Sequence, residues 1–155
     1  MTHESATVRT QVAWVRRETT GPRMLTARGR CIAILNQNDL WRTEYLASAV
    51  PVLDSTPEAA IVFCDHDVID PAGRSLSAEA DHTTQQWGRD KLTQGLYRPF
   101  PELVARQSIP VAMGCLFRRD AIDLTALPDV GPAYDLWLAF ALCRTGGDAR
   151  AYASQ

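Results

Sequence analysis

The sequence has no large excess of positive or negative charge. Its 155 residues include 16 basic and 18 acidic side chains, which gives a formal net charge of −2. No basic excess is therefore available to hold nucleic acid or an anionic membrane surface. The longest apolar runs, residues 31–35 and 59–64, are far shorter than the ~20 residues of a spanning helix, and residues 1–11 lack the apolar stretch of a signal peptide. We expect a cytoplasmic protein with no membrane span and no nucleic-acid partner.

Closely spaced cysteines are also missing. The four cysteines, Cys31, Cys64, Cys115 and Cys143, are spread through the chain without a C-x-x-C pair. Zinc sites and redox pairs are usually marked by such close spacing. Most of these cysteines lie inside apolar runs, where a reduced thiol behaves as a small hydrophobic group. We expect neither disulfides nor a cysteine-based metal site.

What is present is an ordinary globular composition, with 46% hydrophobic and 22% charged residues, in one domain that spans 1–155. Three apolar runs, 31–35, 59–64 and 111–117, have the β-branched and aromatic content of buried strands. A helical pattern separates the first two, which is the arrangement of a βαβ unit. The sequence thus predicts an α/β fold with a mainly parallel sheet, in which the first two strands are parallel neighbours.

Two helices and one long loop complete the prediction. The first helix follows the first buried strand, with Asn38 or Asp39 as its N-cap and Leu40 on its apolar face. The clearest helix spans residues 134–144, which are apolar on a broad face. Residues 75–98 are polar and predict a long loop, a feature that is usually functional or mobile in a compact domain.

Three blocks, in order, resemble the family 2 glycosyltransferases of the GT-A fold. They are residues 27–52, which contain CIAILNQNDLW, residues 57–74, and residues 113–142, which end in DLWLAFAL. The resemblance implies a partial GT-A fold, a mainly parallel sheet flanked by helices. It also implies transfer of a sugar from a nucleotide-sugar donor to a hydroxyl of a carbohydrate acceptor.

In that family the first buried strand ends in D-x-D, whose carboxylates bind a divalent cation that bridges the donor's diphosphate. The matching residues here are Asn36, Gln37 and Asn38, with only Asp39 charged. The resemblance implies Mg²⁺ or Mn²⁺ held by Asn36, Asn38 and Asp39 and no other cofactor. We expect weak binding, because an amide oxygen ligates a hard cation without contributing charge. The alternative is a polar loop that caps the next helix.

The catalytic base is the second departure from the family. Inverting members place a carboxylate at the start of the last helix, where it can deprotonate the acceptor hydroxyl. The matching position here is Ala133, and Asp135 occupies the second acidic position of the motif. Asp135 is therefore the candidate base. Alternatively it is a first-turn carboxylate that the helix dipole favours.

Two further residues are candidates for sugar binding. Trp41 follows the N-Q-N-D cluster and either stacks on a sugar ring or packs into the core. Asp65 comes at the end of the second buried strand, where alternation places it on the same face as Asp67 and opposite His66. The alternative is that these three residues only shape a hairpin.

The family's nucleotide pocket lies in units that precede the strand matching residues 12–16, and this sequence begins at that strand. We expect an N-terminally truncated fold with an unpaired edge strand, which a homodimer or another protein partner covers, with Trp14 buried there. Two functions stay open: a glycosyltransferase-like enzyme, and a catalytically inactive GT-A-like binding or interaction module.

Overall fold

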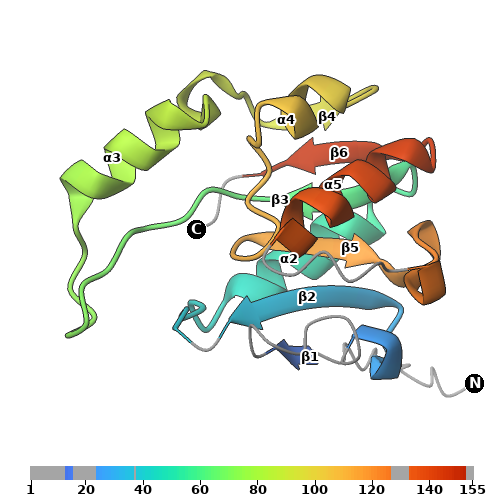
Figure 1. Cartoon of the computed structure of the whole chain (residues 1–155), viewed down its shortest axis with the longest axis horizontal. Helices are drawn as coiled ribbons and strands as arrows, with labels where there is room; N and C mark the ends of the chain where they lie inside the picture. The colour runs from blue at the N-terminus through green and yellow to red at the C-terminus, as the bar shows by residue number, and fades with distance from the viewer. Residues whose placement is uncertain (1–12, 16–23, 37, 127–132, 153–155) are drawn as a thin grey trace, which may run out of the picture.

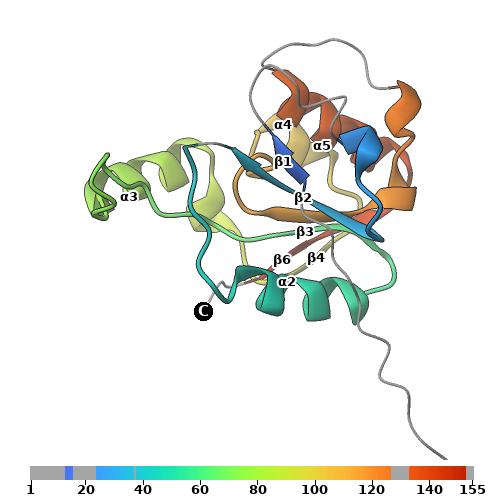
Figure 2. The same ribbon diagram turned by 90° about the horizontal axis from the view of Figure 1, so that it is seen from below.

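The structure is a computed structural model that describes residues 13–15, 24–36, 38–126 and 133–152. It is an α/β domain, a sheet with helices on both faces (Figures 1 and 2). The strands are β1 (Ala13–Val15), β2 (Cys31–Asn36), β3 (Ala59–Phe63), β4 (Gly95–Tyr97), β5 (Cys115–Arg118) and β6 (Asp148–Ala151). The α-helices are α2 (Tyr45–Asp54), α3 (Ser77–Gln86), α4 (Pro101–Ala105) and α5 (Tyr134–Arg144).

The sheet is mixed, with the strand order β1-β2-β5-β3-β6-β4. The pairs β1–β2 and β3–β6 are parallel, whereas β2–β5, β3–β5 and β4–β6 are antiparallel. The prediction of a mainly parallel sheet was therefore wrong for the pairing. The first two apolar runs do form strands of this sheet and run in the same direction, but β5 lies between them. The third run forms a strand only from Cys115, because residues 111–113 make a turn before it.

Alternate residues of the central strands point to opposite faces, as the pleat requires. Ile32 and Phe117 pack with Leu138 of α5 in the larger hydrophobic cluster. Ala33 and Leu116 belong to the second cluster, which contains Tyr45, Ala49 and Leu53 of α2. The strands carry continuous apolar sequence because helices cover both faces, and Figure 2 shows α2 opposite α4 and α5.

Strand β1 lies at one edge of the sheet and pairs with β2, as expected for an edge strand. The rest of the predicted strand, Val12 and Arg16, lies outside the described residues. The side chain of Trp14 also lies outside them, so its predicted burial against a partner stays a prediction. At the opposite edge β4 pairs with β6 alone among the described strands.

The segment 75–98 is not a loop, and this prediction was wrong. It contains α3, a 3₁₀ turn at Arg89–Lys91 and strand β4. Helix α3 has no buried residue and extends away from the sheet at the left of Figure 1. A polar helix with no apolar face gives no hydrophobic periodicity to detect, which explains why the sequence pattern indicated a loop.

The expected N-cap at Asn38 or Asp39 was also wrong. Helix α2 begins at Tyr45, with Glu44 at the N-cap position, so an irregular segment separates it from β2. Leu40, expected on the apolar face of the helix, is 75% exposed. The helix from Tyr134 to Arg144 is confirmed. No helix among the described residues has the length and apolar content needed to cross a membrane.

Candidate functional site

A pocket of about 780 Å³ opens where β2 and β3 end. Its lining comes mainly from the irregular segment before α2, from the segment after β3 and from Ala80, Asp81 and Thr84 of α3. Its lining includes four of the residues proposed from the sequence, namely Asn38, Asp39, Trp41 and Asp65. The polar and ionisable side chains that line it are Asn38, Asp39, Arg42, Glu44, Ser48, Asp65, His66, Asp67, Ser75, Asp81 and Thr84, together with Trp41, Tyr45 and Tyr152.

Trp41 is held in place at this pocket. Its indole Nε1–H donates a hydrogen bond to the carbonyl of Met113 at 3.2 Å. Its ring lies against that of Tyr45, with centroids 4.9 Å apart and planes inclined by 41°. The indole packs beside the core cluster of α2 and also lines the pocket. The expected core packing of Trp41 is therefore partly met, and stacking of its ring on a sugar stays a prediction.

Asp65 is fixed by three donors. Its carboxylate accepts hydrogen bonds from Arg89 Nε at 2.8 Å, from Thr84 Oγ1 at 2.6 Å and from the backbone N–H of His66 at 2.9 Å. The Arg89 side chain is only 5% exposed, and its ion pair joins the segment after β3 to the 3₁₀ turn that follows α3. A partly buried ion pair with added hydrogen bonds fixes the orientation of both side chains. Neither Thr84 nor Arg89 was identified from the sequence, because both lie in the segment predicted as a loop.

Polar atoms without a partner are concentrated at this pocket. The hydroxyl of Tyr45 and Nδ1 of His66 are buried and form no hydrogen bond. Burial raises the pKa of Tyr45, so the phenol is a neutral donor. A buried polar group that lacks a partner is costly, and such groups in native proteins commonly await water or a ligand. Both residues belong to the lining of the pocket.

The His66 imidazole is 17% exposed and lies near Asp65, with 3.6 Å between Nδ1 and Oδ1. Burial, followed by the charge of Arg89, lowers the pKa of His66 despite the opposing effect of the nearby carboxylates. Since the folded-state pKa lies below the unfolded value, stability is full above the unfolded pKa of about 6.5 and falls as the pH drops toward the folded pKa. We therefore expect the native chain to lose melting temperature on going from pH 7.5 to pH 5, and His66→Asn to lose less. Thermal melts of both proteins across that range measure the difference. An equal loss in both would contradict it.

Asn36 does not line the pocket, because its side-chain amide is already engaged. Nδ2 donates to Asp39 Oδ2 at 3.1 Å and to the carbonyl of Ala112 at 3.2 Å. Oδ1 accepts a hydrogen bond from the Tyr134 hydroxyl at 3.1 Å. The amide therefore ties the end of β2 to the turn before β5 and to the start of α5. The aligned Gln37 lies outside the described residues.

Among the described residues no group of three His, Cys, Asp or Glu side chains is arranged to hold a metal ion. Asp39 and Asn38 face the pocket, whereas Asn36 uses its amide within the fold. Asp67 lines the same pocket as Asp65, as does His66, and it also forms an exposed ion pair with Arg42 at 2.7 Å. The described cysteines form no disulfide with one another.

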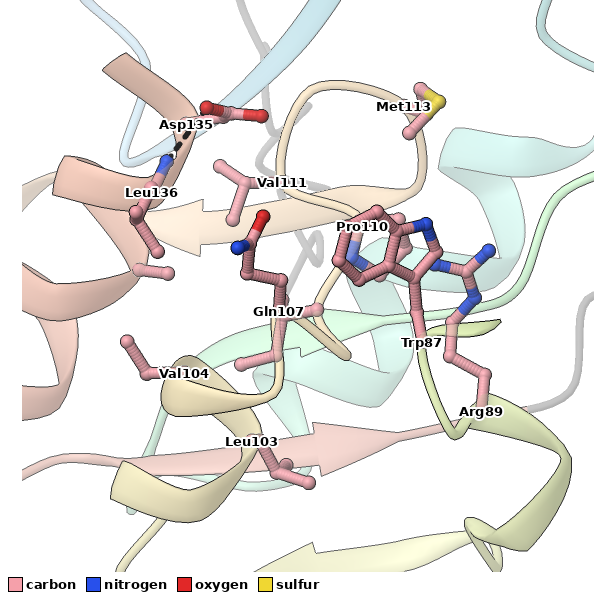
Figure 3. Close-up of a pocket in the computed structure, with 12 residues that line it drawn as sticks. Trp87, Arg89, Leu103, Val104, Gln107, Pro110, Val111, Met113, Asp135 and Leu136 are labelled. Atoms are coloured by element: carbon pink, nitrogen blue, oxygen red, sulfur yellow. Dashed lines mark hydrogen bonds between the residues drawn. The ribbon is translucent and has the colours of Figure 1, made fainter. Parts of the chain in front are cut away.

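Asp135 lies in a second, smaller pocket of about 140 Å³ (Figure 3). One of its oxygens accepts a hydrogen bond from the backbone N–H of Leu136 at 2.8 Å, the contact of a first-turn carboxylate. Met113 lines both pockets, and Arg89 lines the smaller pocket while it pairs with Asp65 of the larger one. The structure thus places the candidate base beside the candidate sugar site and not within it.

No family model matches the chain. A search of curated proteins found similarity to an uncharacterized protein, y4gI, of Sinorhizobium fredii strain NBRC 101917 / NGR234. The two are 38% identical over 66 residues, which is 43% of this chain and 7% of that protein. The chain thus matches a small part of a much longer relative.

Proposed function

We propose that this domain binds a sugar in the larger pocket, as part of a glycosyltransferase-like protein that transfers sugar from a nucleotide-sugar donor to a hydroxyl acceptor. The observation that carries the proposal is the pocket of about 780 Å³ where Trp41, Asp39 and Asp65 meet. Its volume lies in the range of small-molecule sites, about 300–1,000 Å³. The resemblance to family 2 glycosyltransferases supports the same chemistry.

The lining suits a hydroxyl-rich ring. The oriented indole of Trp41 offers a flat apolar face to the ring carbons. Carboxylates accept hydrogen bonds from hydroxyls, and the unpartnered Tyr45 hydroxyl donates or accepts one. In the transfer reaction Asp39 with Asn38 would hold the cation and diphosphate, and Asp135 would take the proton of the acceptor hydroxyl.

A second candidate, binding without transfer, is favoured by two contacts. The Asn36 amide donates from Nδ2 to Asp39 and Ala112 and accepts at Oδ1 from Tyr134, so both ends of the group already hold the fold together. Asp135 faces a different pocket and bonds to its own helix. On this alternative the domain is a carbohydrate-binding or interaction module.

Replacing Trp41 by alanine tests the site. We expect sugar affinity to fall about tenfold, because an aromatic contact contributes about 0.5–1.5 kcal/mol beyond its buried area. Trp41→Phe should retain most of the affinity, since it keeps the ring and loses only the bond to Met113. Phe140→Ala is the matched control, because Phe140 is an exposed aromatic outside this pocket. Titration calorimetry with glucose and with UDP-glucose plus Mn²⁺ measures all four proteins.

Each outcome separates the two candidate functions. Saturable binding of UDP-glucose that requires Mn²⁺ and is weakened by Trp41→Ala supports the transferase. Binding of the free sugar with no response to Mn²⁺ or nucleotide supports the binding module. Equal affinities for the native chain and Trp41→Ala would remove the larger pocket from consideration.

A further inference from the structure

The smaller pocket has a lining unlike that of the larger one. Apolar groups from α4, from the turn before β5 and from α5 form most of it, and Figure 3 shows them around a common space with the Trp87 indole at one end. The apolar lining residues are Trp87, Leu103, Val104, Ile109, Pro110, Val111, Met113, Leu136 and Ala139. The polar lining residues are Arg89, Gln107 and Asp135. An apolar cavity of about 150 Å³ is large enough to bind benzene, so about 140 Å³ admits a group of a few heavy atoms.

One polar atom at this pocket lacks a partner. Arg89 uses Nε to bind Asp65, but its Nη2 is buried and forms no hydrogen bond. A guanidinium carries five N–H donors and no acceptor, so this nitrogen requires an acceptor atom. Figure 3 shows the Arg89 guanidinium beside the Trp87 ring at one end of the pocket, with Asp135 near the other end. The backbone of Gln107, between them, has a φ of 54°, an uncommon conformation for a residue other than glycine.

Charge decides which acceptor fits. Arg89 is already neutralised by Asp65, and Asp135 contributes a further carboxylate to the lining. A carboxylate ligand would therefore meet two protein carboxylates and one guanidinium, an arrangement that repels it. A neutral carbonyl accepts from Nη2 without that repulsion. An amide also supplies an N–H, for which the side-chain oxygens of Gln107 and Asp135 are acceptors.

We propose that the smaller pocket binds a short acylamino group, with the carbonyl at Arg89 Nη2 and the acyl methyl against Val104, Ile109 and Val111. This inference rests on the proposed function in one respect: with a sugar ring in the larger pocket, the acylamino group would be a substituent of that sugar. Met113 lines both pockets, so the two lie next to each other. The domain would then select N-acylated over plain hexoses.

Titration calorimetry with N-acetylglucosamine, glucose, N-propylacetamide and butyrate tests the inference. We expect N-acetylglucosamine to bind about tenfold more tightly than glucose, from one buried methyl and one hydrogen bond. N-propylacetamide should bind and butyrate should not. Ala139→Leu, which fills the pocket from α5, should abolish the preference and leave glucose binding unchanged.

A second variant guards against misfolding. Leu136 is 42% exposed at the rim of the pocket, so Leu136→Trp obstructs the pocket without altering the core, and Phe140→Trp on the next turn is its control. Equal affinities for both sugars without amide binding, or tighter binding of butyrate than of the amide, would overturn the inference while the sugar site stands. A different result would separate the two proposals. If N-propylacetamide binds, both pocket variants abolish that binding and neither sugar binds, the proposed sugar site is wrong and the acylamide pocket is supported.

Discussion

Replacing Asn36 by aspartate will lower the free energy of unfolding by about 3 kcal/mol at pH 7, because it removes two hydrogen bonds and leaves their acceptors facing a new charge. The two lost bonds are those from Nδ2 to Asp39 and to the carbonyl of Ala112, at 3.1 and 3.2 Å. The bond from the Tyr134 hydroxyl survives, since it ends on an oxygen in either residue. Urea denaturation of the native and variant chains measures the change.

The loss of unfolding free energy caused by Asn36→Asp should depend on pH. Asp39 raises the pKa of the introduced carboxyl, so the variant's folded state holds that proton to a higher pH than its unfolded state does. Stability is then highest below the unfolded pKa and is lost as the pH rises through the folded pKa, so the deficit narrows from pH 7 to pH 4. The protonated acid again donates to an acceptor, as the amide did.

Mn²⁺ supplies a second readout for this variant. Two adjacent carboxylates at the end of β2 recreate part of a D-x-D site, so millimolar Mn²⁺ should raise the melting temperature of Asn36→Asp and leave the native chain unchanged. Gln85→Glu, which adds the same charge at an exposed amide outside both pockets, is the control for charge alone. A loss of stability under about 0.5 kcal/mol would show that the amide of Asn36 does not hold the site together.

Replacing Arg118 by methionine will also destabilise the chain by about 3 kcal/mol, since hydrogen bonds to charged groups contribute about 1.5–3 kcal/mol each and three backbone carbonyls lose the guanidinium as donor. Arg118 lies at the end of β5 and donates from Nε to the carbonyl of Ala59 at 2.9 Å. Its Nη2 donates to the carbonyls of Leu53 at 2.7 Å and Thr56 at 3.1 Å. One guanidinium thus fastens β5 to the end of α2 and to the start of β3.

Two variants, Arg118→Lys and Arg30→Met, are the controls for Arg118→Met. Arg118→Lys keeps the charge but presents a single nitrogen, so it should recover less than half of the loss. Arg30→Met removes an exposed arginine whose contact with Asp54 is 3.4 Å long, and it should change stability by less than about 0.5 kcal/mol. Equal effects of Arg118→Met and Arg30→Met in urea denaturation would refute the role assigned to Arg118.

The sequence by itself determined the elements that carry a strong hydrophobic period or an unbroken apolar run. The structure has strands β2 and β3 and helix α5 where residues 31–35, 59–64 and 134–144 predicted them. Burial on both faces of a strand requires an unbroken apolar run, and burial of one helix face requires apolar residues at helical spacing, so both patterns can be seen in the sequence. A strand that includes Ala13–Val15 was also predicted, and its place at an edge was expected from the family resemblance. For the site, the sequence identified Asn38, Asp39, Trp41 and Asp65, all of which meet in one pocket.

Only the tertiary structure decided the order and pairing of the strands and the contacts that complete the site. The insertion of β5 between β2 and β3 adds no local signal, since a strand's hydrophobic pattern is the same beside either neighbour. Helix α3 has no buried residue, so its sequence shows no hydrophobic periodicity from which a helix could be predicted. Thr84 and Arg89 were missed for the same reason, since both lie in the segment predicted as a loop. Asn36 forms hydrogen bonds to residues 76 and 98 positions away, and such bonds form only in the folded chain. The sequence pattern therefore indicated a cation ligand, whereas in the structure the same amide holds distant segments together.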